Sequence, residues 1–289
     1  MVHSYDILGS TAIVKFPDGT SAKEKKKFAD ELLKNQKAIK TVLEKKEKIK
    51  GRLRKLSTEF IAGEKTKEVL YRENNCIFRF NVDETYFSPR LSNERKEIAS
   101  KIKKDEIVLV MFAGVAPYSI VIAKNSKAKK VYSNELNRQA NKYAELNISL
   151  NKLKDKVDLI PGDANKIHEK ISREFVQHSP PSAQSGLRPQ GKNYSSQTSH
   201  NKIPSKFDVI VMPRPQLKDS FLKEAFLLSK KGTRIYYYDF CKEEDITSIV
   251  DKVRSEAKIA KKKIKILEVK RAGEIAPYKV RLRIDFKIL

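Results

Sequence analysis

Small residues and acids follow three apolar, strand-length runs in the middle of the chain. The first run, 107–111, leads into Phe112-Ala-Gly-Val-Ala-Pro-Tyr118, where small side chains would let backbone N–H groups approach a ligand closely. Glu135 follows the second run, about 20 residues further on, at the spacing from which an acid binds both hydroxyls of a ribose. Gly162-Asp163-Ala164 follows the third run. Together the three signals predict a site for a nucleoside cofactor.

Each signal has a plainer explanation when it is taken alone. Small residues after a strand also serve strand-to-helix packing, and an acid at a helix start, such as Glu135, interacts favourably with the helix dipole. Asp163 could accept a hydrogen bond from the exocyclic amino group of adenine, or it could cap the next helix. Ala116 stands where a second glycine would complete a pyrophosphate turn, which favours S-adenosylmethionine over NAD as the cofactor.

Two further segments could contact a substrate. Pro89 makes Tyr86-Phe-Ser-Pro-Arg-Leu91 a rigid loop, in which Arg90 could stabilise developing negative charge, bind a phosphate or remain an ordinary surface charge. Met212-Pro-Arg-Pro215 follows the fourth strand-like run. Prolines remove backbone donors and stiffen the chain, so this segment suits either a wall for a stacked base or a plain strand end.

A sheet is needed to bring these segments together. Strand-like runs alternate with helical patterns, of which 136–150 and 219–228 are the clearest. Such alternation predicts a Rossmann-like α/β fold, with a mostly parallel sheet and helices on both faces. Two last runs, 263–270 and 280–287, predict an antiparallel hairpin at the sheet edge. The expected parallel strands are 107–112, 130–134, 157–161, 207–212 and 233–239.

The first 65 residues predict a separate small α/β domain. Two short strands bent at Gly9 precede an amphipathic helix that runs from Ala22 to about Leu43. A lysine-heavy segment, 44–55, follows that helix.

The larger domain would occupy residues 66–289. It begins with a hairpin of 68–72 and 76–82, followed by an amphipathic helix over 91–102. The segment from 178 to 204 is rich in Ser, Pro, Gln, Gly and Asn and poor in apolar residues, so we expect a flexible insertion at about 178–205.

The charge balance favours a polyanionic partner. The 289 residues include 61 Lys and Arg against 36 Asp and Glu, a formal net charge of +25. Lys and Arg displace counterions condensed on phosphates, so nucleic acid is favoured over a lysine-rich proteome or a high-temperature lifestyle, in which Glu rises with Lys. We expect RNA to be held by the lysine-rich face of 22–55 and by Arg90, Arg95 and Arg214 around the ligand site.

The cysteines, the histidines and the hydropathy pattern exclude further classes of protein. Cys76 and Cys241 lie far apart, and the four histidines form no metal-like cluster in the sequence, so we expect neither a disulfide scaffold nor a metal site. The sequence contains no apolar run of membrane-spanning length and no signal-peptide pattern. We therefore expect a cytoplasmic monomer that does not bind membranes.

Taken in order along the chain, these segments resemble the archaeal and eukaryotic tRNA (guanine-37-N1)-methyltransferase family, including its wyosine-pathway relatives. The resemblance covers nearly the whole chain from Tyr5 onward. It implies a class I fold in which S-adenosylmethionine supplies a methyl group to a tRNA purine beside the anticodon, and a small tRNA-contacting domain over 1–65. The segments that carry it are Tyr86-Phe-Ser-Pro-Arg-Leu-Ser-Asn-Glu-Arg95, Met111-Phe-Ala-Gly-Val-Ala-Pro-Tyr-Ser-Ile120, Glu135-Leu-Asn137, Phe207-Asp-Val-Ile-Val-Met212, Ile275-Ala-Pro-Tyr and Ile284-Asp-Phe-Lys287.

The resemblance also implies roles for single residues. Arg90 would contact the guanine oxygen and stabilise its anionic form, Glu135 would bind the ribose of the cofactor, and Asp163 its adenine. Pro213 would lie beside the target base, and the general base is left open between Asp163 and Asp239. The expected cofactor-binding residues are Tyr86, Phe112, Ala113, Gly114, Val115, Ala116, Pro117, Glu135, Leu136, Asp163, Ala164 and Met212.

Three positions depart from the family pattern. Val110 stands in place of an Asp, Ala116 in place of a Gly, and Pro213 in place of the Asn of an Asn-Leu-Pro motif. The contact with the target base must therefore differ at Pro213. Three hypotheses follow: methylation of N1 of guanosine 37 in the anticodon stem-loop, a wyosine-pathway enzyme that methylates or aminocarboxypropylates modified guanosine 37, or a non-catalytic RNA-binding protein.

Overall fold

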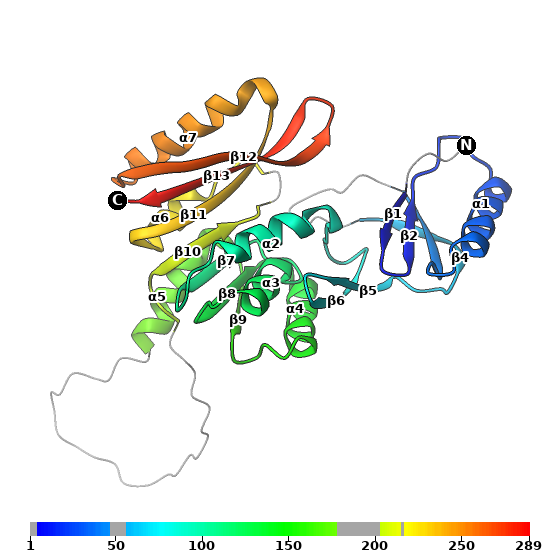
Figure 1. The fold of residues 1–289 in the computed structure, drawn as a ribbon, viewed down its shortest axis with the longest axis horizontal. Helices are drawn as coiled ribbons and strands as arrows, with labels where there is room; N and C mark the ends of the chain where they lie inside the picture. The colour runs from blue at the N-terminus through cyan, green and yellow to red at the C-terminus, as the bar shows by residue number, and fades with distance from the viewer. Residues whose placement is uncertain (1–4, 47–55, 178–202, 215–216) are drawn as a thin grey trace, which may run out of the picture.

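The structure is a computed structural model that describes residues 5–46, 56–177, 203–214 and 217–289. Its strands form sheets of seven, four and two strands (Figure 1). The seven-stranded sheet lies in the larger unit, the four-stranded sheet in the N-terminal unit, and the two-stranded hairpin lies between them. The insertion expected at about 178–205 lies almost entirely outside the described residues. Within them, no helix is long and apolar enough to cross a membrane.

The central sheet has the strand order β12-β13-β11-β10-β7-β8-β9. Its five parallel strands are β7 (Ile107–Met111), β8 (Lys130–Glu135), β9 (Val157–Pro161), β10 (Phe207–Met212) and β11 (Ser229–Lys242). β13 (Lys279–Ile288) pairs antiparallel with β11, and β12 (Ile264–Ala276) forms the edge. The predicted fold class, a mostly parallel sheet with a terminal antiparallel hairpin, is confirmed.

Helices cover both faces of this sheet (Figure 1). Successive strand residues point to opposite faces, so Val108 and Val110 join one core, whereas Leu109 and Met111 join the other. Strands that are apolar on both sides are typical of parallel sheets buried between helices. The first core includes α2 (Ser92–Ser100), α3 (Pro117–Asn125) and α4 (Arg138–Leu150), and the second includes α5 (Ile167–Gln177), α6 (Leu222–Leu227) and α7 (Ile246–Ile259). Short 3-10 turns span η1 (Pro89–Leu91), η2 (Ala164–Lys166) and η3 (Glu243–Asp245).

The N-terminal unit packs one helix against a four-stranded sheet. A reciprocal capping box between Ser21 and Glu24 begins the helix, and its buried Ala29 and Leu32 face the sheet. The elements are β1 (Tyr5–Leu8), β2 (Thr11–Val14), α1 (Ala22–Asn35), β3 (Thr41–Lys45) and β4 (Thr58–Gly63).

The expected helix over 22–43 is wrong at its end. The helix stops at Asn35, and β3 pairs in parallel with β2 instead. Val42 packs in the core beneath α1, while Leu43 packs in the core shared with the larger unit. Neighbouring residues that point to opposite sides require a strand, and both apolar side chains are buried only in that conformation.

Two buried asparagines, one in α4 and one at its C-terminal cap, hold the hairpin formed by β5 (Glu68–Glu73) and β6 (Cys76–Asn81). The Asn147 side chain accepts from the backbone N of Arg79 at 2.7 Å and donates to the Arg79 carbonyl at 3.1 Å. One turn later, Asn151 makes the same pair of bonds to Ile77, at 2.9 and 2.6 Å. The amides thus pair the backbone N–H and C=O groups on the outer edge of β6. Such groups are costly to leave without a hydrogen bond when they are buried.

Candidate functional site

A cavity opens beyond the carboxyl ends of β7, β8, β9, β10 and β11. Its walls come from the segments that follow these strands and from the loop before α2. Open parallel sheets bind ligands at this edge. Of the expected site residues, those that line the cavity are Tyr86, Phe112, Ala113, Gly114, Pro117, Glu135, Leu136, Asp163, Ala164 and Pro213.

Alternate residues of the turn after β7 have left-handed backbone. The angle φ is 57° at Phe112, 58° at Gly114 and 65° at Ala116. Glycine adopts this conformation freely, whereas other residues lose roughly 1–2 kcal/mol there. Packing holds the two strained positions, because the Phe112 ring meets Phe221 edge-on and buried Ala116 accepts the first hydrogen bond of α3 through its carbonyl. The result is a tight turn with small residues on the cavity side.

Glu135 joins this turn to the end of β8. One carboxylate oxygen accepts from the backbone N of Gly114 and the other from the backbone N of Asn137, both at 2.7 Å. Burial raises the pKa of Glu135, and hydrogen bonds from the backbone N–H groups of Asn137, Gly114 and Leu136 partly offset that rise. Each oxygen keeps a further lone pair, so the carboxylate can still accept from a vicinal diol.

The turn after β9 completes this side of the cavity. Asp163 accepts from the backbone N of Asn165 at 3.1 Å and so caps η2, while it also lines the cavity. The side-chain amide of Asn134 holds the turn through the carbonyls of Ile160 and Gly162. Both interpretations of Asp163, as a cap and as a ligand contact, are therefore compatible with its position.

Three expected cofactor residues lie behind the cavity wall. Val115, Ala116 and Met212 are fully buried in the two cores and do not line the cavity. Val110, which departs from the family pattern, is also fully buried in the first core. Its replacement of an Asp therefore changes core packing and leaves the cavity lining untouched.

Arg90 lies outside this first cavity and lines a second one. The second cavity lies between β1, the loop before α2 and the tip of the terminal hairpin, and it shares Tyr86 and Arg281 with the first. Arg90 donates to Asp6 of β1 at 2.8 Å, and this ion pair is largely exposed. The pair raises the pKa of the guanidinium. The N-terminal unit thus contacts the residue expected to act on the substrate.

Arg95 and Arg214 line the first cavity, but the expectation that they hold RNA is wrong, because both are buried and ion-paired. Arg95 is 1% exposed and Arg214 2% exposed. Arg95 forms a two-pronged ion pair with Glu73 and also donates to the Ser88 carbonyl. These donors are already used inside the protein, so Arg95 orders the 86–91 loop instead of meeting a phosphate.

Arg214 turns inward at the end of β10 and pairs with Asp239. The distance between the Arg214 guanidinium and the Asp239 carboxylate is 2.6 Å, and the Tyr237 hydroxyl donates to the other carboxylate oxygen, also at 2.6 Å. Arg214 donates as well to the carbonyls of Leu217 and Asp219. Both oxygens of Asp239 are engaged, and Asp239 does not line the cavity. Within the described ranges, no three His, Cys, Asp or Glu side chains gather as metal ligands would.

Sequence reasoning missed the cavity wall formed by β11 and β13. Tyr238, Phe240 and Arg281 line the cavity, and none of them belongs to a recognisable motif. The only usable signal was the period of two along β11, which places Tyr238 and Phe240 on one face of the strand. The pairing of Phe240 with Arg281 depends on the register of two strands far apart in sequence.

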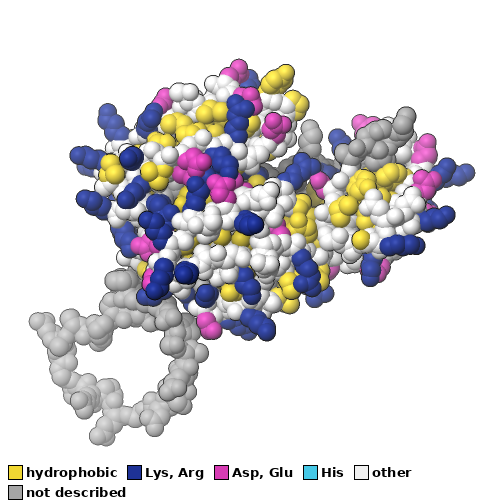
Figure 2. Space-filling view, viewed as in Figure 1, with side chains coloured by type: hydrophobic (Ala, Val, Ile, Leu, Met, Phe, Trp, Pro, Cys, Tyr) yellow, Lys and Arg dark blue, Asp and Glu magenta, His cyan; other side chains and the backbone are white. Residues whose placement is uncertain are grey.

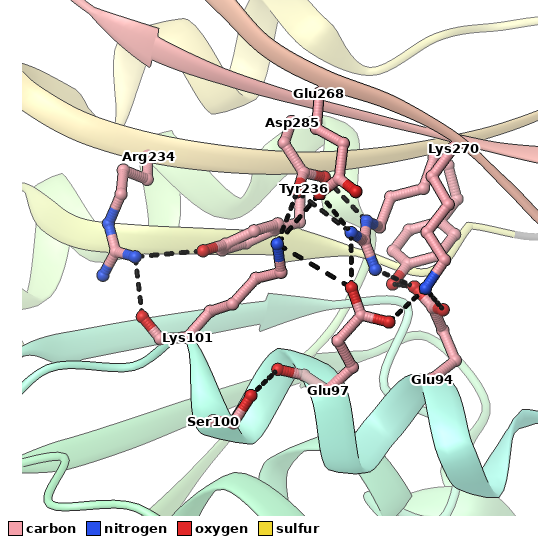
Figure 3. A network of polar contacts seen from close by, with 11 residues as sticks. Glu94, Glu97, Ser100, Lys101, Arg234, Tyr236, Glu268, Lys270 and Asp285 are labelled. Carbon is pink, nitrogen blue, oxygen red and sulfur yellow. Dashed lines mark hydrogen bonds and ion pairs between the residues drawn. The ribbon is translucent and has the colours of Figure 1, made fainter.

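A buried charge network, here called the α2 network, fixes the helix that follows the 86–91 loop (Figure 3). Arg283 of β13 is fully buried and binds Glu94 and Glu97 of α2 at 2.5 and 2.8 Å. It also binds Asp285 on its own strand and Glu268 on β12. Lys101 and Lys270 add further ion pairs to the same carboxylates (Figure 3). The network links α2 to the terminal hairpin from which Arg281 reaches the cavity.

Basic side chains are widely distributed on the surface. Figure 2 shows Lys and Arg over both the N-terminal and the larger unit. On α1, Lys23, Lys26 and Lys27 are exposed next to one another. This part of the lysine-rich face of 22–55 lies on the outside of the molecule, as expected, while 47–55 lies outside the described residues.

Two protein-family models match the chain. The TRM5/TYW2 methyltransferase domain matches residues 69–184, and the TYW2 N-terminal domain matches residues 1–66. One relative, the tRNA (guanine(37)-N(1))/4-demethylwyosine(37)-methyltransferase Taw22 of Nanoarchaeum equitans, is 34% identical over 99% of this chain and 100% of its own.

Solved structures agree with these matches. A complex of aTrm5 with tRNALeu has a TM-score of 0.77 at 26% identity, and the match covers 100% of this chain and 73% of the other. Trm5 of Methanocaldococcus jannaschii in complex with adenosine has a TM-score of 0.74 at 28% identity, covering 99% of this chain and 74% of the other. The similarity thus includes the N-terminal unit and the terminal hairpin as well as the cavity.

Proposed function

The chain belongs to the TRM5/TYW2 methyltransferase family, and from this premise we propose that it transfers a methyl group from S-adenosylmethionine to N1 of guanosine 37 in tRNA. The name of the Nanoarchaeum equitans relative states methylation of guanine 37 at N1, and a related structure contains a tRNA. The net charge of +25 suits an RNA substrate. We propose that the anticodon stem-loop lies across the mouths of both cavities.

The residues of the first cavity fit S-adenosylmethionine. Glu135 offers two carboxylate oxygens to the ribose hydroxyls, and Asp163 offers an acceptor to the adenine amino group. The small turn residues Ala113 and Gly114, together with Pro117, leave room for the methionine end. A bound S-adenosylmethionine supplies an electrophilic methyl group on a positively charged sulfur.

The protein has three tasks in this reaction. It must hold N1 of guanine in line with the methyl carbon, let the N1 proton leave, and stabilise the negative charge that develops on O6. We propose that Arg90 leaves Asp6 when RNA binds and contacts O6, and that Pro213 forms the wall beside the purine. We propose that Asp239 serves as the partner that holds Arg214, because it pairs with that arginine and does not line the cavity.

One observation carries the proposal. The Glu135 carboxylate binds the backbone N of Gly114 at the carboxyl ends of two adjacent parallel strands, inside a cavity that continues into a second one between the two units. An acid at this place is suited to a ribose, and the adjoining space is suited to a second, larger ligand.

The test is methyl transfer to an unmodified tRNA transcript that carries G37. We expect mass spectrometry of the digested product to show 1-methylguanosine at position 37, and a matched transcript with A37 to gain no methyl group. Glu135→Ala should lose S-adenosylmethionine binding in calorimetry and lose transfer with it. A wild-type protein that binds S-adenosylmethionine but leaves G37 unmodified would contradict the proposal.

A second candidate function is methylation of 4-demethylwyosine at the same position. It is favoured by the name of the Nanoarchaeum equitans relative and by Pro213, which stands where the family pattern has an Asn. Incubation with tRNA that carries 4-demethylwyosine distinguishes the outcomes. A gain of one methyl group would support this activity, a larger gain would indicate aminocarboxypropyl transfer, and no gain would restrict the protein to guanosine.

A further inference from the structure

Phe240 and Arg281 form a pair on the cavity wall that lies outside the motifs named in the sequence analysis. They are directly opposite each other in the antiparallel register of β11 and β13. The Arg281 guanidinium lies over the Phe240 ring, with its central carbon 5.1 Å from the ring centroid. Both residues line the first cavity, and Arg281 also lines the second. The pair therefore stands where the two cavities meet.

Among the described residues, no group accepts a hydrogen bond from Arg281, whereas the neighbouring arginines form ion pairs within the protein. Arg95, Arg214 and Arg283 are buried, and each donates to carboxylates or carbonyls of the protein, although the Nε of Arg214 has no partner among the described residues. Arg281 is half-buried, and none of the described residues accepts a hydrogen bond from it or forms an ion pair with it. Its only recorded side-chain partner in those ranges is the Phe240 ring. A guanidinium held over an aromatic ring is partly desolvated and keeps its N–H groups available.

Among the described residues after β10, the one in the position of the family's Asn offers no hydrogen-bond donor to a purine. Pro213 has neither a backbone N–H nor a polar side chain, and Arg214 next to it points into the ion pair with Asp239. β11 is the neighbour of β10 in the sheet, and β13 is the next strand beyond it. Arg281 is thus a free cationic donor on the same wall, two strands away from the proline.

We propose that Arg281 recognises the target guanine through its O6/N7 edge and stabilises O6 while N1 is methylated. This inference rests on the proposed function. Arg pairs with the O6 and N7 acceptors of guanine through two N–H groups, and that contact leaves N1 free to react. O6 has two lone pairs, so Arg281 from the hairpin and Arg90 from the loop can both bind it.

The charge of Arg281 matters in the reaction itself. The N1 proton leaves to solvent water, the N1 lone pair forms the new bond to the methyl carbon, and the electrons of the broken carbon–sulfur bond return to sulfur. Negative charge is shared between N1 and O6 before that bond is complete. A guanidinium fixed at O6 lowers the cost of this charge without having to reorganise.

The test compares Arg281→Gln and Arg281→Lys with the wild type and with Lys287→Gln. Lys287 is exposed on the same strand but does not line either cavity, so its variant removes the same charge without touching the site. Single-turnover methyl transfer to G37 transcripts is measured at saturating S-adenosylmethionine from about pH 6 to about pH 9, since guanine N1 ionises unaided only at high pH.

We expect Arg281→Gln to slow methyl transfer on the order of 10²-fold near neutral pH. The rate of this variant should recover as pH rises, because N1 then loses its proton with less help from the protein. Arg281→Lys should recover only part of the rate, since it keeps the charge and loses the planar fork. Lys287→Gln should match the wild type. Binding of S-adenosylmethionine and the melting temperature should be unchanged in all variants.

Three results would overturn the inference. The first is a wild-type transfer rate in Arg281→Gln, and the second is a loss of rate that is the same at every pH. The third is a loss of rate explained by weaker tRNA binding, with the slope of log Kd against log salt reduced by about one phosphate contact. The last would make Arg281 a phosphate ligand. Failure of the proposed function is distinguishable, because the wild type itself would then leave G37 unmethylated.

Discussion

At the scale of single residues, the ion pair between Arg90 and Asp6 is weak. Their side chains are 75% and 55% exposed, and exposed ion pairs of this kind are worth about 0–1 kcal/mol. RNA that offers a phosphate or a guanine oxygen can therefore displace Asp6 at little cost. The contact gives Arg90 a defined position before the substrate arrives without holding it there firmly.

Substitution of the two partners should have very different effects. Arg90→Gln should slow methyl transfer by about 10²- to 10³-fold, as expected for a lost oxyanion donor. Asp6→Asn should change the rate less than about threefold, because it removes only a weak exposed pair. Single-turnover transfer to G37 transcripts measures both. Equal losses in the two variants would mean that the pair is needed for the fold, and full activity of Arg90→Gln would remove Arg90 from the mechanism.

Some residue positions were predictable from the sequence and others were not. Glu135 was predictable because it is an acid that follows a strand and lies about 20 residues after a small-residue turn. The structure places Glu135 at the cavity. Arg95 and Arg214 were wrongly expected at the surface, because their partners Glu73 and Asp239 lie 22 and 25 residues away. A charge can be recognised in a sequence, but its partner is set by folding.

At the scale of elements, the α2 network makes the stability of the fold depend on pH. Although partial burial acts to raise it, hydrogen bonds from Arg283 and Lys270 lower the pKa of Glu97 from 4.5 to about 2. A carboxyl with a lowered folded-state pKa stabilises the fold above its unfolded pKa and loses that contribution as pH falls toward the folded value. The relevant window is therefore between about pH 4.5 and about pH 2.

Glu97→Gln should reveal this contribution. We expect the free energy of unfolding to fall by about 1–3 kcal/mol at pH 7, and the difference from the wild type to shrink as pH is lowered below about 4.5. Urea unfolding at a series of pH values measures it. Glu274→Gln, an exposed change on the same hairpin, is the matched control and should be neutral. A difference that stays constant down to low pH would contradict the role of Glu97.

The alternation of strands and helices was predictable, and the positions where it failed have physical causes. Residues 41–45 continue the helical spacing of α1, yet pairing with β2 makes them a strand. Asn147 and Asn151 looked like ordinary polar residues of a helix, although their amides complete the edge of β6. Both outcomes depend on a distant segment that supplies hydrogen-bonding groups, and the spacing of local residues does not contain that information.

At the scale of the whole molecule, the net charge of +25 should make tRNA binding strongly dependent on salt. We expect the triple variant Lys23→Gln, Lys26→Gln and Lys27→Gln to reduce the slope of log Kd against log salt by up to about 2, at roughly 0.7 for each lost phosphate contact. Binding titrations at several salt concentrations measure the slope.

A matched control separates local contacts from total charge. The triple variant Lys261→Gln, Lys263→Gln and Lys265→Gln removes the same charge from exposed positions before and at the start of β12, away from the N-terminal unit (Figure 1). Its slope should equal that of the wild type. An equal reduction in both variants would show that α1 is not a specific RNA-contacting surface.

The position of β13 in the sheet has a consequence for protein synthesis. β13 follows all of the other described strands along the chain, yet it lies between β11 and β12 and carries both Arg281 and Arg283. A nascent chain can fold its N-terminal unit while translation continues, since domains fold as units in the order in which they emerge. Until β13 leaves the ribosome, however, the cavity lacks one wall and α2 lacks its anchor. A chain in which β13 has not yet joined the sheet therefore lacks Arg281 at the cavity and Arg283 against α2.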